Sequence, residues 1–167
     1  MNPDLSLSHY SKALTLKPRS CAQHPAIKPQ GLWLSVDGPW DWKAWCECEN
    51  FWLETLANRF VITLRRNARI LYISTVDGLD WVNERAADSG VYDINRFGAH
   101  YIDWERVAGA YRGIIIAPYL WEARLDPRYS WYYGWDCASG CIWDAKAIAA
   151  VRLDECGHSV AVPESDD

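Results

Sequence analysis

The sequence has no apolar run long enough to cross a membrane. Runs such as Ile114 to Ala117 and Ala147 to Val151 are far shorter than the roughly 20 residues that a spanning helix needs. The first residues also lack the basic segment followed by an apolar one that marks a secretory signal. We therefore expect a cytoplasmic protein that does not bind membranes.

Positive charge is scarce as well. The chain has 17 Lys and Arg against 22 Asp and Glu, a formal net charge of -5 and a pI near 5.3. An acidic chain gains little from neutralising phosphates, so we expect no general nucleic-acid binding. The net charge does not exclude a local basic patch.

Three common catalytic motifs are missing from the chain. It has no glycine-rich phosphate loop, no His-Glu-x-x-His and no Gly-x-Ser-x-Gly. These absences argue against kinases, zincins and serine hydrolases.

Phenylalanine is also rare. There are 3 Phe beside 11 Trp and 9 Tyr. The rings gather in two stretches, Pro39–Trp52 and Tyr129–Trp143. Indole and phenol rings serve equally well in cores, stacking sites and interfaces, so their abundance alone does not choose among these roles. For any single Trp, the core is the commoner role.

The 6 cysteines are expected to be reduced thiols, mostly in the core, because nothing else marks the chain as secreted. Structural zinc is the alternative, since zinc needs four thiolate or imidazole ligands. None of the candidate pairs has the Cys-x-x-Cys spacing of a zinc knuckle, so we predict no metal site. These pairs are Cys46 with Cys48, Cys137 with Cys141, and Cys156 with His158.

The chain of 167 residues, half of them apolar, is long enough for one domain with a proper core. We place this domain at residues 1–160 and expect the acidic segment 161–167 to be disordered. The alternation of strands and short helices predicts an α+β fold with two packed, mainly antiparallel sheets and short flanking helices. The expected strands are 5–10, 31–36, 60–64, 69–75, 114–117 and 140–143, and the strands 60–64 and 69–75 are expected to form a hairpin. The expected helices are 41–56, 75–87 and 103–111. The expected loops are 17–30, 89–100 and 119–138.

Three segments of this pattern carry polar or aromatic groups on expected strands. They are Leu7–Ser11, Gly31–Ser35 and Ser139–Asp144. In order and spacing they resemble the ADP-ribosyltransferase fold, in which a His-containing first strand, a Gly-x-aromatic-x-Ser strand and a late strand hold NAD. The resemblance covers roughly residues 5–153 and implies NAD as the substrate.

The first segment resembles the His-Gly-Thr or His-Tyr-Thr signature of the diphtheria-toxin-like and poly-ADP-ribose-polymerase-like branch. The resemblance implies that His9 binds the adenosine ribose and that Ser11 helps to hold the nicotinamide amide. A strand fixes such a donor better than a mobile loop does. Tyr10, counted with this NAD-binding segment, is expected to point to the opposite face and serve the core.

The second segment, with Gly31, Trp33 and Ser35, resembles the Gly-x-Tyr-x-Ser strand of the family. Trp33 stands at the aromatic position, where a ring stacks on the cationic nicotinamide. Period-2 alternation places Gly31, Trp33 and Ser35 on one face. An ordinary half-buried strand would show the same alternation.

The third segment departs from the family. Where the family has a catalytic Glu, this chain has Ser139, which carries no charge to offset a cationic sugar. Either a neighbouring carboxylate replaces the Glu, with Asp136 preferred and Glu122 as the second candidate, or the protein is a slow enzyme or none. A loop Asp that makes a local turn contact is the ordinary alternative for Asp136.

The resemblance implies an NAD-dependent mono-ADP-ribosyltransferase that modifies a protein or nucleic acid, in relatives often a toxin or a phage factor acting on its host. The loop Trp121–Ala138 would contact the acceptor, unless its rings fold back over the core. The alternative is a non-catalytic module that binds NAD, another nucleotide or a protein on the same fold. An RNA 2'-phosphotransferase shares the fold but needs more basic residues around the site.

Overall fold

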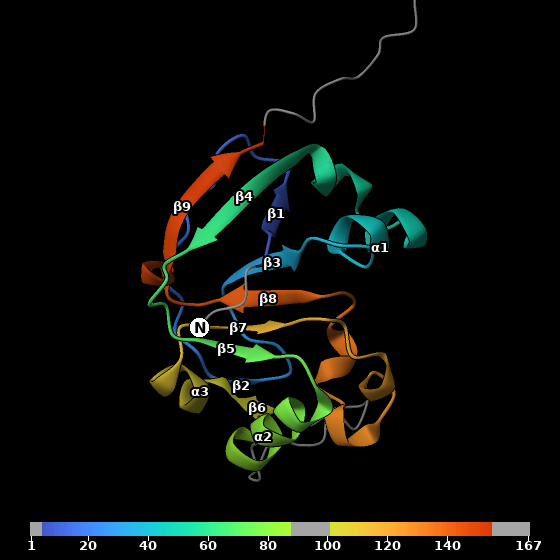
Figure 1. The fold of residues 1–167 in the computed structure, drawn as a ribbon, viewed down its shortest axis with the longest axis vertical. Helices are drawn as coiled ribbons and strands as arrows, with labels where there is room; N and C mark the ends of the chain where they lie inside the picture. The colour runs from blue at the N-terminus through green and yellow to red at the C-terminus, as the bar shows by residue number, and fades with distance from the viewer. Residues whose placement is uncertain (1–4, 88–100, 155–167) are drawn as a thin grey trace, which may run out of the picture.

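The computed structural model describes residues 5–87 and 101–154 (Figure 1). In this part of the chain the architecture is mixed α/β, with one seven-stranded sheet and a small two-stranded one. The large sheet has the order β5-β7-β8-β3-β1-β4-β9, and the small one pairs β2 with β6. The strands are β1 (Leu7–Ser11), β2 (Pro25–Ala26), β3 (Leu32–Val36), β4 (Asn58–Leu64), β5 (Ile70–Ile73), β6 (Ile102–Asp103), β7 (Gly113–Ile116), β8 (Ser139–Ile142) and β9 (Ile148–Leu153).

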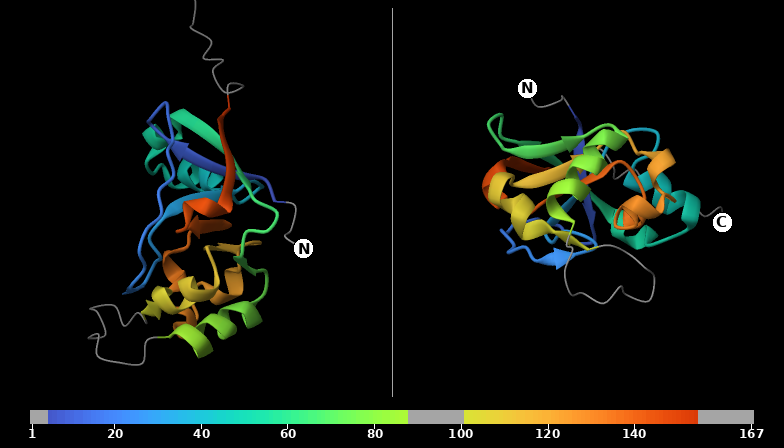
Figure 2. Two further views of the ribbon diagram at one scale, coloured as in Figure 1. Left: turned by 90° about the vertical axis from the view of Figure 1, so that its left-hand side faces the viewer. Right: turned by 90° about the horizontal axis from the view of Figure 1, so that it is seen from below.

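Short helices flank the sheet (Figures 1 and 2). Asp41 and Asp103 cap α1 and α3, their carboxylates accepting from the backbone N–H groups of Ala44 and Arg106. The helices are α1 (Trp42–Glu49), α2 (Val76–Ala86) and α3 (Trp104–Ala110), with 3-10 turns η1 (Leu53–Ala57), η2 (Trp121–Ala123), η3 (Pro127–Tyr129), η4 (Tyr132–Gly134) and η5 (Ala145–Ala147).

Strand β7 separates two hydrophobic clusters. Ile114 and Ile116 belong to the first, which lies under α2, α3 and the aromatic segment 119–135. Ile115 points the other way, into the second cluster with Phe60 and Ile62 of β4. Because both faces of β7 are covered, its sequence is a continuous apolar run rather than an alternation.

The expected pair of packed sheets is instead one hydrogen-bonded sheet. The pairing runs without a break from β5 to β9 through β3 and β1. Its two halves nevertheless share the second cluster, because Ile115 and Ile142 of one half contribute to it together with Phe60 and Ile62 of the other. The two halves thus cover the same cluster, although their strands belong to one hydrogen-bonded sheet. Only β5 and β7 pair in parallel among the described strands.

The hairpin expected at 60–75 is wrong. The turn itself exists, since the Ala68 N–H donates to the Arg65 carbonyl at 3.0 Å. The strands on either side then separate: β4 pairs with β1 and β9, and β5 pairs with β7. The side chains of Ile62 and Ile70 face the same cluster. The alternation of apolar residues around them predicts that both segments are strands, but it does not show which strands they pair with.

Two further expectations change in extent. The helix expected at 41–56 ends at Glu49, where Asn50 takes left-handed backbone angles (φ 50°), and η1 follows after Trp52. The loop expected at 17–30 contains β2. The expected loop 89–100 and the expected disordered tail 161–167 lie outside the described residues. Within residues 5–87 and 101–154, no helix is long and apolar enough to span a bilayer.

Candidate functional site

Strands β1 and β3 part after two paired positions. Leu7 lies opposite Val36 and Ser8 opposite Ser35, and there the ladder ends. From Ser8 onward β1 runs along β4 instead, and Figure 1 shows the two strands diverging. The divergence leaves an opening in the middle of the sheet.

The side chain of His9 bridges this opening. Its Nδ1 lies 2.8 Å from the backbone carbonyl oxygen of Trp33 on β3. A carbonyl only accepts, so Nδ1 carries the proton and Nε2 of the neutral ring is left as an acceptor. The ring nitrogen that is not bonded to Trp33 is therefore an acceptor and not the donor expected from the sequence. Burial lowers the pKa of His9, and the hydrogen bond to Trp33 opposes this shift. The imidazole is therefore neutral at pH 7.

A row of three buried serines crosses the sheet beside the opening. Ser35 of β3 lies opposite Ser8 on one side and Ser139 of β8 on the other. Each hydroxyl has a partner: Arg59 Nε donates to Ser8 at 2.8 Å, the Trp42 N–H donates to Ser35 at 2.9 Å, and Ser139 donates to the Cys137 carbonyl at 3.0 Å.

Ser35 thereby holds the first turn of α1 against the sheet. This helix and the turn after it present a wall of rings. Trp42 and Trp45 stack with centroids 5.0 Å apart, and Phe51 and Trp52 stack at 4.7 Å. Trp52 takes left-handed backbone angles (φ 47°).

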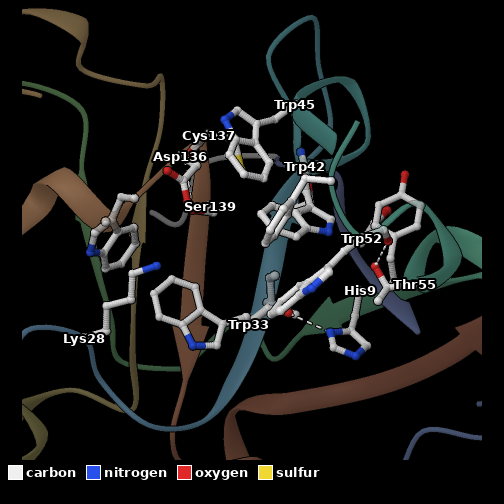
Figure 3. A pocket seen from close by; sticks show the side chains of 17 residues that line it. His9, Lys28, Trp33, Trp42, Trp45, Trp52, Thr55, Asp136, Cys137 and Ser139 are labelled. Carbon is white, nitrogen blue, oxygen red and sulfur yellow. Dashed lines mark hydrogen bonds between the residues drawn. The ribbon is translucent and has the colours of Figure 1, made fainter. Parts of the chain in front are cut away.

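The opening, the serines and the ring wall bound one cavity of about 530 Å³ (Figure 3). Its volume is in the range of small-molecule and cofactor sites. The lining residues are Ser8, His9, Tyr10, Lys28, Trp33, Leu34, Ser35, Trp42, Trp45, Phe51, Trp52, Thr55, Gly134, Trp135, Asp136, Cys137 and Ser139.

Two charged side chains, those of Lys28 and Asp136, line the cavity (Figure 3). Desolvation raises the pKa of Asp136, and the charges of Lys28 and Arg124 oppose this shift. Desolvation likewise lowers the pKa of Lys28, opposed by Asp136. Each charge therefore favours the ionised form of the other.

Six residues expected from the resemblance line this cavity, namely His9, Tyr10, Trp33, Ser35, Asp136 and Ser139. Tyr10 is half-buried and lines the cavity, contrary to the expectation that it serves only the core. Its position follows from the separation of β1 from β3, which opens space beside the strand. Desolvation raises its pKa to about 12.

Three other expected residues are not in the cavity lining. Ser11 accepts a hydrogen bond from the Ala13 N–H at 3.1 Å. Gly31 (φ 153°) lies where a Cβ would overlap the carbonyl oxygen of Ile142, so it permits the close pairing of β3 with β8. Glu122 is exposed on η2.

The segment Trp121–Ala138 turns most of its rings inward. Tyr129, Trp131, Tyr132 and Trp135 are buried in the first cluster. Trp121, Leu125 and Tyr133 remain exposed, at 50%, 80% and 57%. The surface available to an acceptor is therefore smaller than the composition of the segment indicates.

The ring wall, formed by α1 and the turn that leads into η1, is not among the residues expected in the site. The clustering of rings in Pro39–Trp52 is the available signal, and helical spacing puts Trp42 and Trp45 near one face. Whether that face meets the core or a cavity depends on the angle between α1 and β1, which no local pattern gives.

The five cysteines that the structure describes form no recognisable ligand set. Cys21, Cys46, Cys48, Cys137 and Cys141 are free thiols. Burial raises the pKa of Cys46 to about 11 and that of Cys137 to about 12. Across residues 5–87 and 101–154, no three His, Cys, Asp or Glu side chains gather as metal ligands. Cys156 and His158 lie outside the described residues.

No known protein family, curated protein or solved structure matches this chain.

Proposed function

We propose that this protein binds NAD in the cavity between β1, β3 and α1 and transfers ADP-ribose to a macromolecular acceptor in the cytoplasm. One observation carries the proposal. His9, Trp33 and Ser139, one residue from each of the three segments that resemble ADP-ribosyltransferases, line a single cavity. A chance resemblance of short motifs gives no reason for such convergence.

The lining offers the contacts that a dinucleotide needs. The Nε2 atom of His9 accepts from a ribose hydroxyl, while the ring stays oriented by its bond to the Trp33 carbonyl. The ring of Trp33 stacks on the flat, electron-poor nicotinamide, which gains about 1 kcal/mol or more when water is excluded. The rings of Trp42, Trp45 and Trp52 supply further stacking surface for the adenine.

The reaction breaks the bond between the ribose C1' and the nicotinamide nitrogen, and the bonding electrons leave with nicotinamide. Positive charge passes from the pyridinium to the sugar until the acceptor nucleophile bonds to C1' and gives up its proton to solvent water. An ionised carboxylate nearby stabilises this charge. Asp136 is the carboxylate that lines the cavity, and the charges of Lys28 and Arg124 oppose the rise in its pKa that desolvation causes.

We assign acceptor contact to the exposed part of the segment Trp121–Ala138. Trp121 packs beside Trp40 with centroids 5.1 Å apart, and the guanidinium of Arg124 lies 5.7 Å from the ring centre of Tyr133. Rings and an Arg suit either a nucleobase or a protein surface.

A non-catalytic NAD- or nucleotide-binding module is the second candidate, and Ser139 favours it. This residue stands where the family has its Glu, and its hydroxyl is already bonded to the Cys137 carbonyl. The RNA 2'-phosphotransferase reading has less support, because Lys28 is the single Lys or Arg among the cavity-lining residues that the structure describes.

Thermal unfolding with NAD, paired with chromatography of released nicotinamide, separates these readings. A rise in melting temperature together with accumulating nicotinamide supports the transferase. A rise without nicotinamide supports the binding module. No rise and no nicotinamide overturns NAD binding in either form and favours a module that binds another nucleotide or a protein.

A further inference from the structure

The amine of Lys28 lies against the ring on which the nicotinamide is proposed to stack. Its Nζ is 5.2 Å from the ring centre of Trp33, at cation–π distance. Lys28 comes from the segment between β2 and β3, and Figure 3 shows its amine directed into the cavity, between Trp33 and Asp136. The ammonium group of Lys28 therefore occupies the part of the cavity next to the Trp33 ring.

Charges in the cavity attract the ammonium group of Lys28, but the described residues form no ion pair with it. Asp136 and Cys137 are the titratable groups whose charges act on it. Among residues 5–87 and 101–154, no carboxylate oxygen lies within 4.0 Å of its Nζ. The residue is also exposed overall, so its side chain can leave the cavity without breaking an ion pair.

Gly134 makes this position of the lysine possible. A Cβ added at Gly134 would lie 2.7 Å from Cε of Lys28. The stem of Lys28 therefore lies across Gly134, at the end of η4, and a side chain there would push the amine away from Trp33. The position of the Lys28 amine over the Trp33 ring therefore depends on the absence of a side chain at Gly134.

We propose that Lys28 is an internal ligand of this cavity, and that organic cations, including the pyridinium ring of NAD, bind by displacing its ammonium group from the Trp33 ring. The choice of pyridinium as a probe rests on the proposed function. The displacement itself does not, because it concerns any cation that the ring can bind. A lysine that instead binds the phosphates of a nucleotide would behave differently in the same experiment.

The test compares the wild-type protein with Lys28→Met, which keeps the stem length and removes the charge, and with Lys28→Arg, which keeps a charge. Affinities are measured for tetramethylammonium, 1-methylnicotinamide (a cation), nicotinamide (neutral) and ADP-ribose (phosphates without pyridinium). Removing the internal cation should strengthen binding of both cations by roughly two- to five-fold, the range of an exposed cation–π contact. Nicotinamide should change less, and Lys28→Arg should resemble wild type.

A second readout concerns the lysine itself. In NMR spectra the ring current of Trp33 should shift the Lys28 Hε signals upfield, and adding tetramethylammonium should return them toward their solvent-exposed position. The proposal is overturned if those signals show no ring-current shift, or if neither cation binds Lys28→Met more tightly than wild type. It is equally overturned if Lys28→Met loses ADP-ribose affinity while cation affinities stay unchanged, the result expected of a phosphate ligand. Failure of NAD cleavage alone overturns the transferase and leaves the tetramethylammonium results standing.

Discussion

The imidazole of His9 is bonded to the backbone of Trp33, with Nδ1 2.8 Å from the carbonyl oxygen. The bond joins β1 and β3 at the point where their own pairing has ended. One residue of the proposed NAD site therefore orients the strand that carries another.

We predict that His9→Ala weakens NAD binding roughly ten-fold, because it removes one polar contact worth about 1–1.5 kcal/mol and loosens the strand opening. Isothermal titration with NAD measures the effect. Ser11→Ala serves as the control, since Ser11 lies on the same strand outside the cavity lining. Equal losses in both variants would contradict the assignment.

Protonation of His9 should cost stability in weak acid. Its pKa in the folded protein lies below the ordinary histidine value of 6.5, so the unfolded chain binds more protons between these two values. Stability from this residue is complete above pH 6.5 and is lost as the pH falls toward the lowered pKa. Denaturant unfolding of wild type and His9→Gln across this range should show a shallower loss in the variant. Parallel curves would rule out the contribution.

Trp33→Ala should weaken NAD binding by roughly ten-fold or more, because the stacking surface for the nicotinamide is lost. Trp121→Ala is the matched control, an indole that is 50% exposed and absent from the cavity lining. Fluorescence titration measures both. If the control loses as much affinity as Trp33→Ala, the nicotinamide does not lie on Trp33.

Asp136→Asn should slow nicotinamide release by about 100-fold while NAD affinity changes little, because the carboxylate acts on charge that develops only in the transition state. Glu122→Gln should leave the rate unchanged, since Glu122 is exposed on η2. Single-turnover kinetics distinguish the two variants. If Glu122→Gln releases nicotinamide slowly while Asp136→Asn releases it at the wild-type rate, then Glu122 and not Asp136 is the catalytic carboxylate.

Ser35→Ala should destabilise the fold by about 1 kcal/mol, because the Trp42 N–H at the start of α1 loses its acceptor. Chemical denaturation measures this change. Ser11→Ala is again the comparison, since its hydroxyl accepts only the exposed Ala13 N–H. A cost confined to Ser11→Ala would remove Ser35 from this role.

Much of the local structure follows from sequence patterns. The alternation around Leu32 and Leu34 predicts β3, and Asp41 and Asp103 predict the starts of two helices, because periodicity and capping act over a few residues. Strand partners do not follow. Ile62 and Ile70 present the same alternation whether β4 and β5 pair or separate, and the choice depends on burial against Ile115 and Ile142.

The candidate site shows the same division. The motifs around His9, Trp33 and Ser139 are local and can be read from the chain. Lys28 could not be found that way, since its place depends on the space left by Gly134, more than a hundred positions later. The wall formed by Trp42 and Trp52 likewise depends on how α1 is set against the sheet.

The row formed by Ser8, Ser35 and Ser139 joins strands that lie far apart along the chain, and this has a consequence for biosynthesis. A ribosome completes β1 and β3 first, and β8 emerges only after about a hundred further residues have been added. Until then the nascent polypeptide lacks one side of the cavity. Whatever chemistry the cavity performs is thus withheld until β8 has been made.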